Sequence, residues 1–338
     1  MRIVLDAMGG DNAPQVEVKG TVDAIKKNRD LNVILVGKKE EIEKYLNTYK
    51  LSEKERARLE VVNANEVITM SDEPAKAFKQ KQDSSMIVGA KLVKEGRADA
   101  FVSAGNTGAM LVTSLLTIGR IPGVIRPAIL VPMPSKSGTT AVLDAGANVD
   151  CKPIHLAQFA IMGSIYASHI FKINKPRVGV MSVGEEEGKG NELTIEAKEI
   201  IKKLNLNFKG NVEGRDVFNG NADVVVCDGF VGNIILKVGE GAGVLLVSEI
   251  KKGAKKSLLT IIGGLLMKKV FIQVKDRINP DAYGGAPLLG IQKPVIICHG
   301  SASAEGIKNA LIVAYEFVDG HINEEIESEV KKMEAKSE

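Results

Sequence analysis

Several loops in this sequence place small and polar residues directly after an apolar run. The sharpest is 103–108, Ser-Ala-Gly-Asn-Thr-Gly, which leads into a helical stretch at Ala109. Successive backbone amides at the end of a strand, aligned with a helix N-terminus, favour anion binding. An ordinary strand–turn–helix connection with an N-cap residue shows the same pattern. The candidate anion-binding residues are Ser103, Gly105, Asn106, Thr107 and Gly108.

Two acidic loops repeat this pattern. Asp144 and Asn148 belong to Asp-Ala-Gly-Ala-Asn, and Asp228 and Gly232 belong to Asp-Gly-Phe-Val-Gly, which Asn233 follows. A carboxylate at the end of a buried strand can orient a base or a cation, and it can equally cap a helix. Both interpretations stay open from the sequence.

Two further loops carry groups that could supply charge or a proton. Lys189 and Asn191 lie in Gly-Lys-Gly-Asn at 188–191, a loop that could fold over an anion or stay solvated. His299 directly follows the apolar run 294–298. Its side chain is therefore expected to face a cleft, where it could transfer a proton.

Motifs for nucleotide, zinc and serine-hydrolase chemistry are missing from the sequence. The loop 6–11 lacks the G-x-G-x-x-G fingerprint, and 184–190 departs from a P-loop in its spacing and its final glycine. There is no HExxH sequence and no G-x-S-x-G elbow. The three cysteines form no Cys-x-x-Cys pair. We expect no metal, no disulfide and no cofactor.

Composition argues against several other functions. The chain has 45 Lys+Arg against 42 Asp+Glu, and this balance gives no broad attraction for nucleic acid. Aromatic residues are 4% and Trp is absent, which disfavours base stacking. The first apolar run starts at Ile3 without a leader, and no run reaches the roughly 20 residues that span a bilayer. We expect a cytoplasmic protein.

The elements that must position these loops alternate between strands and helices. Strands that are apolar on both faces indicate a mostly parallel sheet covered by helices on both sides. We therefore expect an α/β fold, with ligands bound outside the carboxyl ends of the strands. The expected strands are 2–6, 32–36, 98–103, 127–132, 140–144, 177–183, 222–227 and 294–298.

The segment 251–275 has a different character, because lysine pairs bracket a short apolar run at 257–267. This pattern is typical of an interfacial segment whose apolar side chains enter lipid, but also of a buried helix or a subunit interface. Its double glycine, Gly263–Gly264, suggests the tip of a hairpin. The candidate membrane contacts are Leu258, Leu259, Ile261, Ile262, Leu265 and Leu266. The charged segment 321–338 is expected to be a solvated helical tail with a frayed end.

Taken in order, these motifs resemble the bacterial phosphate acyltransferase (PlsX) family of phospholipid synthesis. The resemblance covers residues 1–320 and has one departure, Ala302, where a second serine is expected after Ser301. The matching motifs are 6–11, 103–109, 144–148, 189–192, 228–233, 283–286 and 299–301.

This resemblance implies transfer of a long-chain fatty acyl group from acyl carrier protein to inorganic phosphate. It implies a three-layer α/β/α fold similar to phosphate acetyltransferases and isocitrate dehydrogenases. A two-lobed catalytic domain would span 1–320, with a helical hairpin projecting at 232–280. The implied partners are a second copy in a homodimer, the membrane surface, and a membrane glycerol-3-phosphate acyltransferase that uses the product. The protein would be cytoplasmic and peripherally associated with the membrane.

Such a reaction needs few catalytic groups, because phosphate is already an anionic nucleophile and a thiolate is a fair leaving group. We expect the amides of 103–108 and Lys189 to hold phosphate. Asn233 would stabilise the oxyanion, and His299 would protonate the thiol or orient phosphate. The acidic carrier protein would dock on a basic patch formed by Lys79, Lys81, Lys91 and Lys94 or by 251–256.

Two alternative functions stay open. The same fold could serve a short-chain acyl-CoA:phosphate acyltransferase, which the acyl chain and its carrier would distinguish. The chain could also be a non-catalytic scaffold recruited to membranes, in which the glycine loops are only turns.

Overall fold

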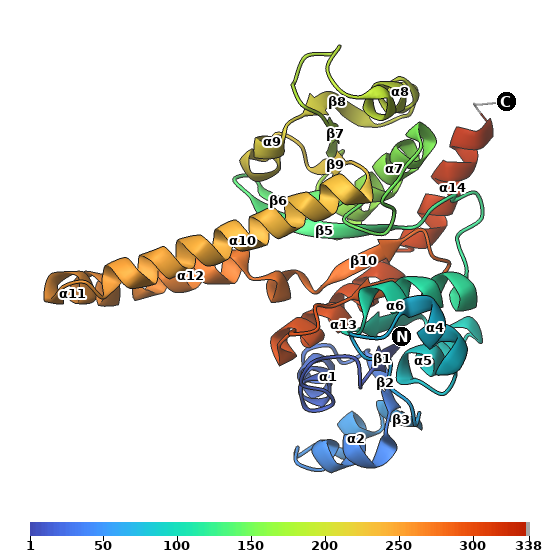
Figure 1. Ribbon diagram of the computed structural model, residues 1–338. Coiled ribbons are helices and arrows are strands. Elements are labelled where there is room, and N and C mark those ends of the chain that lie inside the picture. The colour runs from blue at the N-terminus through green and yellow to red at the C-terminus, as the bar shows by residue number, and fades with distance from the viewer. Residues whose placement is uncertain (336–338) are drawn as a thin grey trace.

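The computed structural model describes residues 1–335, except for the side chains of Leu258 and Lys275. Two lobes share one sheet, and a helical arm projects from them (Figure 1). The strands are β1 (Arg2–Asp6), β2 (Asn32–Gly37), β3 (Leu59–Asn63), β4 (Ala100–Ser103), β5 (Ala128–Ser135), β6 (Gly138–Leu143), β7 (Arg177–Met181), β8 (Asn207–Val212), β9 (Val224–Val226), β10 (Ala286–Leu289) and β11 (Val295–Ile297).

Helices cover the sheet and form the arm. They are α1 (Gln15–Lys27), α2 (Lys39–Leu46), α3 (Glu53–Arg56), α4 (Pro74–Gln80), α5 (Ser85–Lys94), α6 (Thr107–Thr113), α7 (Pro153–His169), α8 (Glu192–Ile201), α9 (Gly214–Asn219), α10 (Gly229–Ala254), α11 (Leu258–Leu266), α12 (Lys268–Ile278), α13 (Ala304–Asp319) and α14 (Ile322–Ala335). A π-helical turn, Ser114–Ile118, extends α6, and a 3-10 turn, Pro280–Tyr283, precedes β10.

The sheet consists of two parallel halves that run in opposite directions. Its strand order is β3-β2-β1-β4-β11-β10-β5-β6-β9-β7-β8. The strands from β3 to β11 are parallel and form the first lobe. Those from β6 to β8 are parallel and form the second. Between them β10 and β5 pair antiparallel with both of their neighbours. The expected α/β fold with a mostly parallel sheet is confirmed.

The core of the first lobe follows from the alternation of side chains along buried strands. In β1, Ile3 and Leu5 are fully buried in one apolar cluster, and Val4 is fully buried in another. Because neighbouring residues of a strand point to opposite faces, both faces of β1 must be covered. Helices α1 and α13 pack together on this lobe, and α5 contacts β1, β2 and β4. Sequence analysis missed β3 and β8, which are edge strands of mixed polarity, and the short β10.

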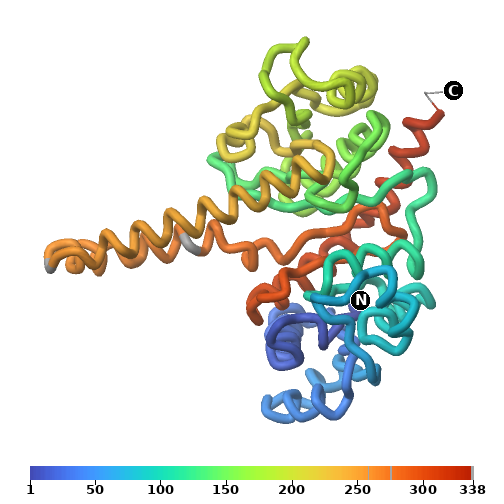
Figure 2. Tube along the Cα trace, viewed as in Figure 1, coloured from blue at the N-terminus to red at the C-terminus, as the bar shows by residue number. Residues whose placement is uncertain are grey.

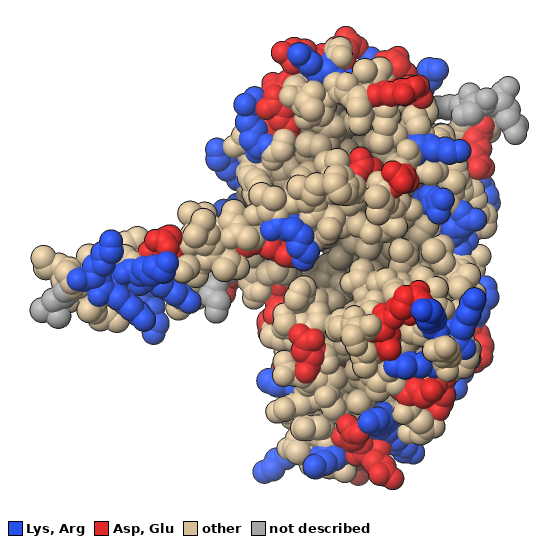
Figure 3. Space-filling model, in the orientation of Figure 1, with Lys and Arg blue, Asp and Glu red and all other residues tan. Residues whose placement is uncertain are grey.

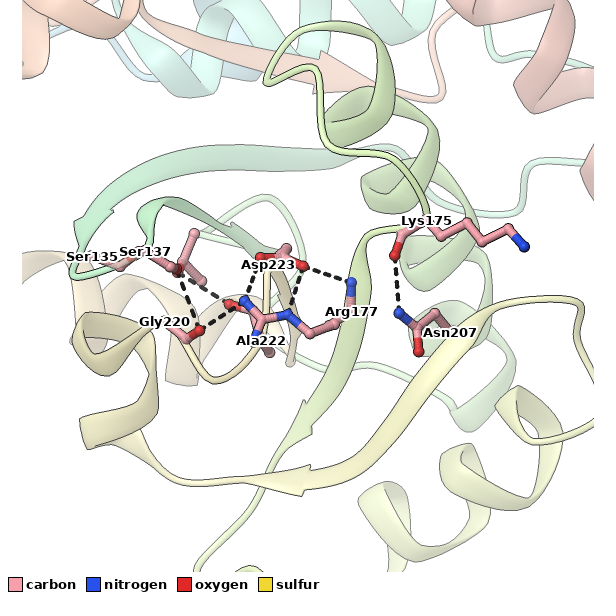
Figure 4. A network of polar contacts seen from close by, with 9 residues as sticks. Ser135, Ser137, Lys175, Arg177, Asn207, Gly220, Ala222 and Asp223 are labelled. Atoms are coloured by element: carbon pink, nitrogen blue, oxygen red, sulfur yellow. Dashed lines mark hydrogen bonds and ion pairs between the residues drawn. The ribbon is translucent and has the colours of Figure 1, made fainter.

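A partly buried ion pair joins two elements of the second lobe. The Arg177 guanidinium donates from Nε to Asp223 Oδ2 (2.9 Å) and from Nη2 to Oδ1 (2.7 Å). The same Nη2 also donates to the Gly220 carbonyl (2.8 Å), and the Arg177 amide donates to Asp223 Oδ2 (2.8 Å). Figure 4 shows how this pair joins the start of β7 to the residues that precede β9. Burial raises the pKa of Asp223, but the Arg177 hydrogen bonds outweigh burial and leave that pKa below its ordinary value.

The C-terminal segment corrects one expectation. Helix α14 is packed on α7 rather than solvated, because Ile322, Ile326 and Val330 form one apolar face that is fully buried. Its charged residues occupy the remaining faces. The frayed end expected from the sequence falls on 336–338, which lie outside the described residues.

The arm has three helices where the sequence predicts two. Helix α10 runs outward, α11 lies at the tip, and α12 returns alongside α10 (Figures 1 and 2). Gly263 and Gly264 lie within α11, so the double glycine is not the turn. By length and composition α10 is also apolar enough to cross a membrane, and 6% of its most apolar window is buried. The sequence does not predict an apolar helix of this length, because glycines and charged residues interrupt the apolar runs of α10.

We expect Asp223→Asn to lower the free energy of unfolding by about 2–3 kcal/mol, because it removes the charge that accepts three hydrogen bonds from Arg177. The control is Glu60→Gln, which breaks an exposed pair with Arg97 at 2.6 Å and should cost less than about 0.5 kcal/mol. Urea denaturation of both variants measures the difference. Equal losses would show that the Arg177–Asp223 pair has no special role.

Candidate active site

A large apolar cavity lies between the two lobes and the arm. Its volume is about 1760 Å³. The walls come mainly from β5, α10 and α12, with strand-end residues from both lobes. In Figure 3 the surface is hollowed between the lobes beside the root of the arm, and few charged groups lie in the hollow. The cavity is therefore suited to an apolar ligand with a polar end.

Five positions from the predicted loops line this cavity, namely Thr107, Ala145, Gly146, Asn233 and His299. Thr107 and His299 follow β4 and β11 of the first lobe, whereas Gly146 and Asn233 follow β6 and β9 of the second. A Cβ atom at Gly146 would lie 3.8 Å from Cβ of Asn233, so this loop passes close to the Asn233 side chain. Both lobes therefore contribute polar groups to one site.

The His299 ring is held in one tautomer. The Ser301 amide donates to His299 Nδ1 (3.2 Å), and Ser301 Oγ lies 2.7 Å from the same nitrogen. A backbone amide can only donate, so Nδ1 is an acceptor and the neutral ring carries its proton on Nε2. The side chain is exposed and lines the cavity. His299 can therefore present an N–H donor to a ligand.

The loop 103–108 is organised from within. Ser103 Oγ is buried and donates to Asp6 Oδ2 (2.8 Å), and it accepts from the Gly105 amide (3.0 Å). Asn106 Oδ1 accepts from the Ala109 amide (3.0 Å), and its Nδ2 faces the carbonyls of 69, 70 and 72.

This arrangement corrects the expectation that the side chains of Ser103 and Asn106, and the Gly105 amide, are free for an anion. The helix begins at Thr107 rather than Ala109. A Cβ atom at Gly108 would lie 2.8 Å from the Pro74 ring, so that residue packs closely against α4. Within this loop Thr107 is the residue that reaches the cavity. The first-turn amides of α6 have no acceptor within the helix and point the same way as its N-terminus.

Asp144 is a structural hub rather than a free base. Its buried carboxylate accepts from the amides of Ile129 (3.0 Å), Gly146 (3.2 Å), Ala147 (3.0 Å) and Asn148 (2.6 Å). The Asn148 side chain donates to Asp144 Oδ2 (2.9 Å) and to the Pro127 carbonyl (2.7 Å). Burial raises the pKa of Asp144 despite these donors. Asp144 and Asn148 thus shape the loop that carries Gly146.

The start of α10 is fitted against this loop. Asp228 is its N-cap and accepts from the Val231 amide (2.9 Å), which confirms the capping interpretation. The Gly229 amide donates to the Asn148 carbonyl (2.7 Å). A Cβ atom at Gly232 would lie 1.9 Å from the Asp144 carbonyl oxygen, so only glycine fits there. These contacts set the direction of α10 and the position of Asn233.

Lys189 and Asn191 lie apart from the cavity. Asn191 caps α8 by accepting from the Thr194 amide (3.0 Å). Lys189 is exposed, is absent from the described lining of the cavity, and lies over Gly184. The strand order explains this position of Lys189. Strand β9 lies between β6 and β7, so the loop after β7 lies about 10 Å from the loop after β6. Three cationic residues that sequence analysis missed do line the cavity: Lys136, Lys237 and Arg277.

Sequence analysis also missed an acidic cluster beneath the His299 loop. The Asp11 amide donates to the Gly300 carbonyl (2.8 Å). Glu17 is 1% exposed and accepts from the Gly10 amide, and its Oε2 has no partner among the described residues. Burial, together with the charges of Asp6 and Asp11, raises the pKa of Glu17 to about 7. In the sequence, the only sign of this cluster is Glu17, an acidic residue in the first turn of the helix that follows the 6–11 motif.

The cysteines and the acidic groups give no sign of a metal centre. Among residues 1–335, no group of three or more His, Cys, Asp or Glu side chains is placed to hold a metal ion. Cys227 and Cys298 are buried, and Cys151 is half-buried. Burial raises the pKa of Cys151 and of Cys298 to about 12, which disfavours the reactive thiolate.

Sequence comparison places the chain among known relatives. The family described as "Fatty acid synthesis protein" matches residues 1–325. The phosphate acyltransferase of Halothermothrix orenii is 47% identical over 334 residues, which are 98% of this chain and 99% of that protein. That of Pelotomaculum thermopropionicum is 48% identical over 336 residues, 99% of this chain and 97% of the relative.

Solved structures show the same fold at low identity. A phosphotransacetylase from Streptococcus pyogenes matches with a TM-score of 0.61 and 21% identity, covering 94% of each chain. The 4-hydroxythreonine-4-phosphate dehydrogenase of Klebsiella pneumoniae matches with a TM-score of 0.54 and 13% identity, covering 94% of this chain and 99% of that one. These likenesses confirm the expected similarity to the phosphotransacetylase fold.

We expect Glu17→Gln to stabilise the protein at pH 8 and to leave its stability almost unchanged at pH 4. With a pKa raised from 4.5 to about 7, the native state binds the Glu17 proton more tightly than the unfolded state does, so stability falls as pH rises across that window. Removing the carboxyl should therefore recover up to about 3 kcal/mol at pH 8. Denaturant titrations at both pH values measure this. The exposed Glu40→Gln is the control, and a pH-independent effect would contradict the assignment.

Proposed function

Because this chain belongs to the phosphate acyltransferase family, we propose that it transfers a long-chain fatty acyl group from acyl carrier protein to inorganic phosphate. Family membership makes it a transferase of fatty acid and phospholipid synthesis. The observation that supports a long acyl chain is the apolar cavity. Its volume of about 1760 Å³ exceeds the roughly 300–1,000 Å³ of ordinary small-molecule sites, and an acetyl group would leave most of it empty.

The proposed reaction joins a phosphate oxygen to the thioester carbonyl carbon. The Thr107 side chain and the Thr107 and Gly108 amides at the start of α6 hold phosphate near this carbon, because a helix N-terminus favours an anion. In this proposal the glycine-flanked loop of Lys189 moves from its position beside the cavity to bring positive charge to the phosphate. The Asn233 amide group donates to the oxyanion that forms on the carbonyl oxygen.

Collapse of that intermediate breaks the carbon–sulfur bond. The thiolate leaves while His299 Nε2 donates a hydrogen bond to its sulfur, in the orientation that the Ser301 amide holds through Nδ1. The thiolate takes its proton from the attacking phosphate, which enters as hydrogen phosphate. The products are an acyl phosphate and the carrier with a free thiol.

The arm supports a membrane location for product release. At its tip, Leu259 and Leu266 are 83% and 82% exposed. Lysines flank this apolar stretch on both sides in the sequence, at 251, 252, 255, 256, 268 and 269. Figure 3 shows Lys or Arg side chains gathered on the arm. Exposed leucines beside lysines suit the surface of an anionic bilayer, where a peripheral enzyme would pass acyl phosphate to a glycerol-3-phosphate acyltransferase.

A homodimer and a docked carrier protein complete the proposal. Val238 and Leu245 on α10 are 65% and 61% exposed, and neither is a lining residue of the cavity. A second copy would cover this outer face of the helix. The lysines of the arm, or those of α4 and α5, would meet the acidic carrier protein.

The first test incubates the protein with palmitoyl-acyl carrier protein and follows the free thiol. We expect thiol release only when phosphate is present, together with recovery of palmitoyl phosphate. Release from acetyl-CoA but not from the palmitoyl carrier would instead support the short-chain enzyme. No release from either donor would support the scaffold, whose vesicle binding would then be measured.

The second test separates the roles of three residues. His299→Ala should lower kcat by about 10²–10³-fold through loss of the hydrogen bond to the leaving sulfur, and Asn233→Ala by about 10²-fold through loss of the oxyanion donor. Lys189→Ala should mainly raise the KM for phosphate, because it removes a charge that acts on the anion. Steady-state kinetics at varied phosphate concentration measure all three. A full rate without His299, or an unchanged phosphate KM without Lys189, would remove that residue from the mechanism.

A further inference from the structure

We propose that the groove between α10 and α12 holds the fatty acyl chain, with its methyl end toward the tip of the arm, and that Gly243 determines how long a chain fits. This inference rests on the proposed function and adds the location of the chain and a residue that governs specificity. It follows from the continuity of the cavity, the chemistry of its walls and the spacing of small residues along α10.

The cavity is continuous from the reacting groups to the tip. Asn233 and His299 line it at the root of the arm, whereas Ile261 and Leu265 of α11 line it at the far end. The lining residues of α10 run from Asn233 to Ala254, a distance of about 30 Å at 1.5 Å per residue. A slot of this length, open to the carbonyl site at one end, has the shape of an extended acyl chain.

The walls of the slot are mostly apolar. The side chains that form them include Leu236, Val247, Ile250, Phe271 and Val274. The charged groups near the root are engaged elsewhere. Lys237 pairs with Glu240 at 2.9 Å, and Arg277 donates to the Ser135 carbonyl at 2.5 Å. Lys251, Lys255 and Lys268 also line the slot, nearer the tip. The slot therefore gains most from an apolar occupant, which displaces water from these apolar walls.

The lining residues of α10 include half-buried positions at 236, 239–240, 243 and 247–248, which follow the three-to-four-residue spacing of one helix face. Several of them are small: Gly239, Ala242, Gly243 and Ala254. A Cβ atom at Gly239 would already lie 2.9 Å from Met133 Cε, so the slot is narrow there. A Cβ atom at Gly243 would meet nothing within 4 Å. A larger side chain at 243 can therefore enter the slot without disturbing the wall.

Gly243 lies about 15 Å along α10 from Asn233. A leucine there would block the outer half of the slot and spare the inner half. Gly241 provides a matched control, since its Cβ atom would also meet nothing within 4 Å and it is not a lining residue of the cavity. Gly243→Leu and Gly241→Leu thus make the same change in helix propensity on the same helix.

The experiment compares kcat/KM for palmitoyl- and butanoyl-acyl carrier protein in these two variants. We expect Gly243→Leu to lower the palmitoyl value at least about tenfold and to leave the butanoyl value within about twofold. Gly241→Leu should change neither value by more than about twofold. Unchanged palmitoyl kinetics in Gly243→Leu, or an equal loss with both donors, would overturn the proposal.

A binding measurement keeps this inference separate from the proposed reaction. Displacement of a fluorescent fatty acid by palmitate should be weakened by Gly243→Leu and unaffected by Gly241→Leu. If the wild-type protein fails to turn over the palmitoyl carrier but shows this binding pattern, the groove assignment stands and the proposed reaction fails. If light scattering shows that Gly243→Leu alone dissociates a dimer, with palmitate displacement unchanged, the slot is an interface between copies and the proposal is wrong.

Discussion

The buried carboxylate of Asp144 accepts hydrogen bonds from the amides of Ile129, Gly146, Ala147 and Asn148, and the arrangement of the site depends on it. These bonds tie β5 to the loop after β6. The first turns of α10 are seated on the same loop, with Gly232 against the Asp144 carbonyl. The direction of the whole arm, and with it the position of Asn233 over Gly146, follows from this fit. This fit at the base of α10 matters for the arm, because few other parts of the described chain contact the arm.

The sheet imposes a second constraint on the chemistry. Its parallel halves run in opposite directions, yet loops from both line one cavity. Strands of a sheet rotate with respect to one another, so loops that a flat sheet would separate can approach across several strands. The site therefore combines the helix N-terminus and histidine of the first lobe with the asparagine of the second. Each lobe alone would hold only part of this polar lining.

The acidic cluster of Asp6, Asp11 and Glu17 lies beneath the 103–108 loop and the His299 loop and holds both in place. The Asp6 carboxylate accepts a hydrogen bond from the Ser103 hydroxyl, and the Asp11 amide donates one to the Gly300 carbonyl. Burial raises the pKa of Asp6 and of Glu17, and this costs stability at high pH. In return the 103–108 loop and the His299 loop share one support.

The sequence by itself determined the α/β class, the order of the glycine loops and the family, because strand periodicity and local motifs are properties of neighbouring residues. It also placed His299, Asn233 and Thr107 among the candidates, since each directly follows a strand or opens a helix. It did not reveal that Ser103, Asn106 and Asp144 are engaged in supporting their own loops, or that α14 is packed on the core. Nor did it place Lys189 to the side of the cavity. Strand order, long-range hydrogen bonds and burial decided these points, and they depend on contacts between residues far apart in the chain, which only the folded structure brings together.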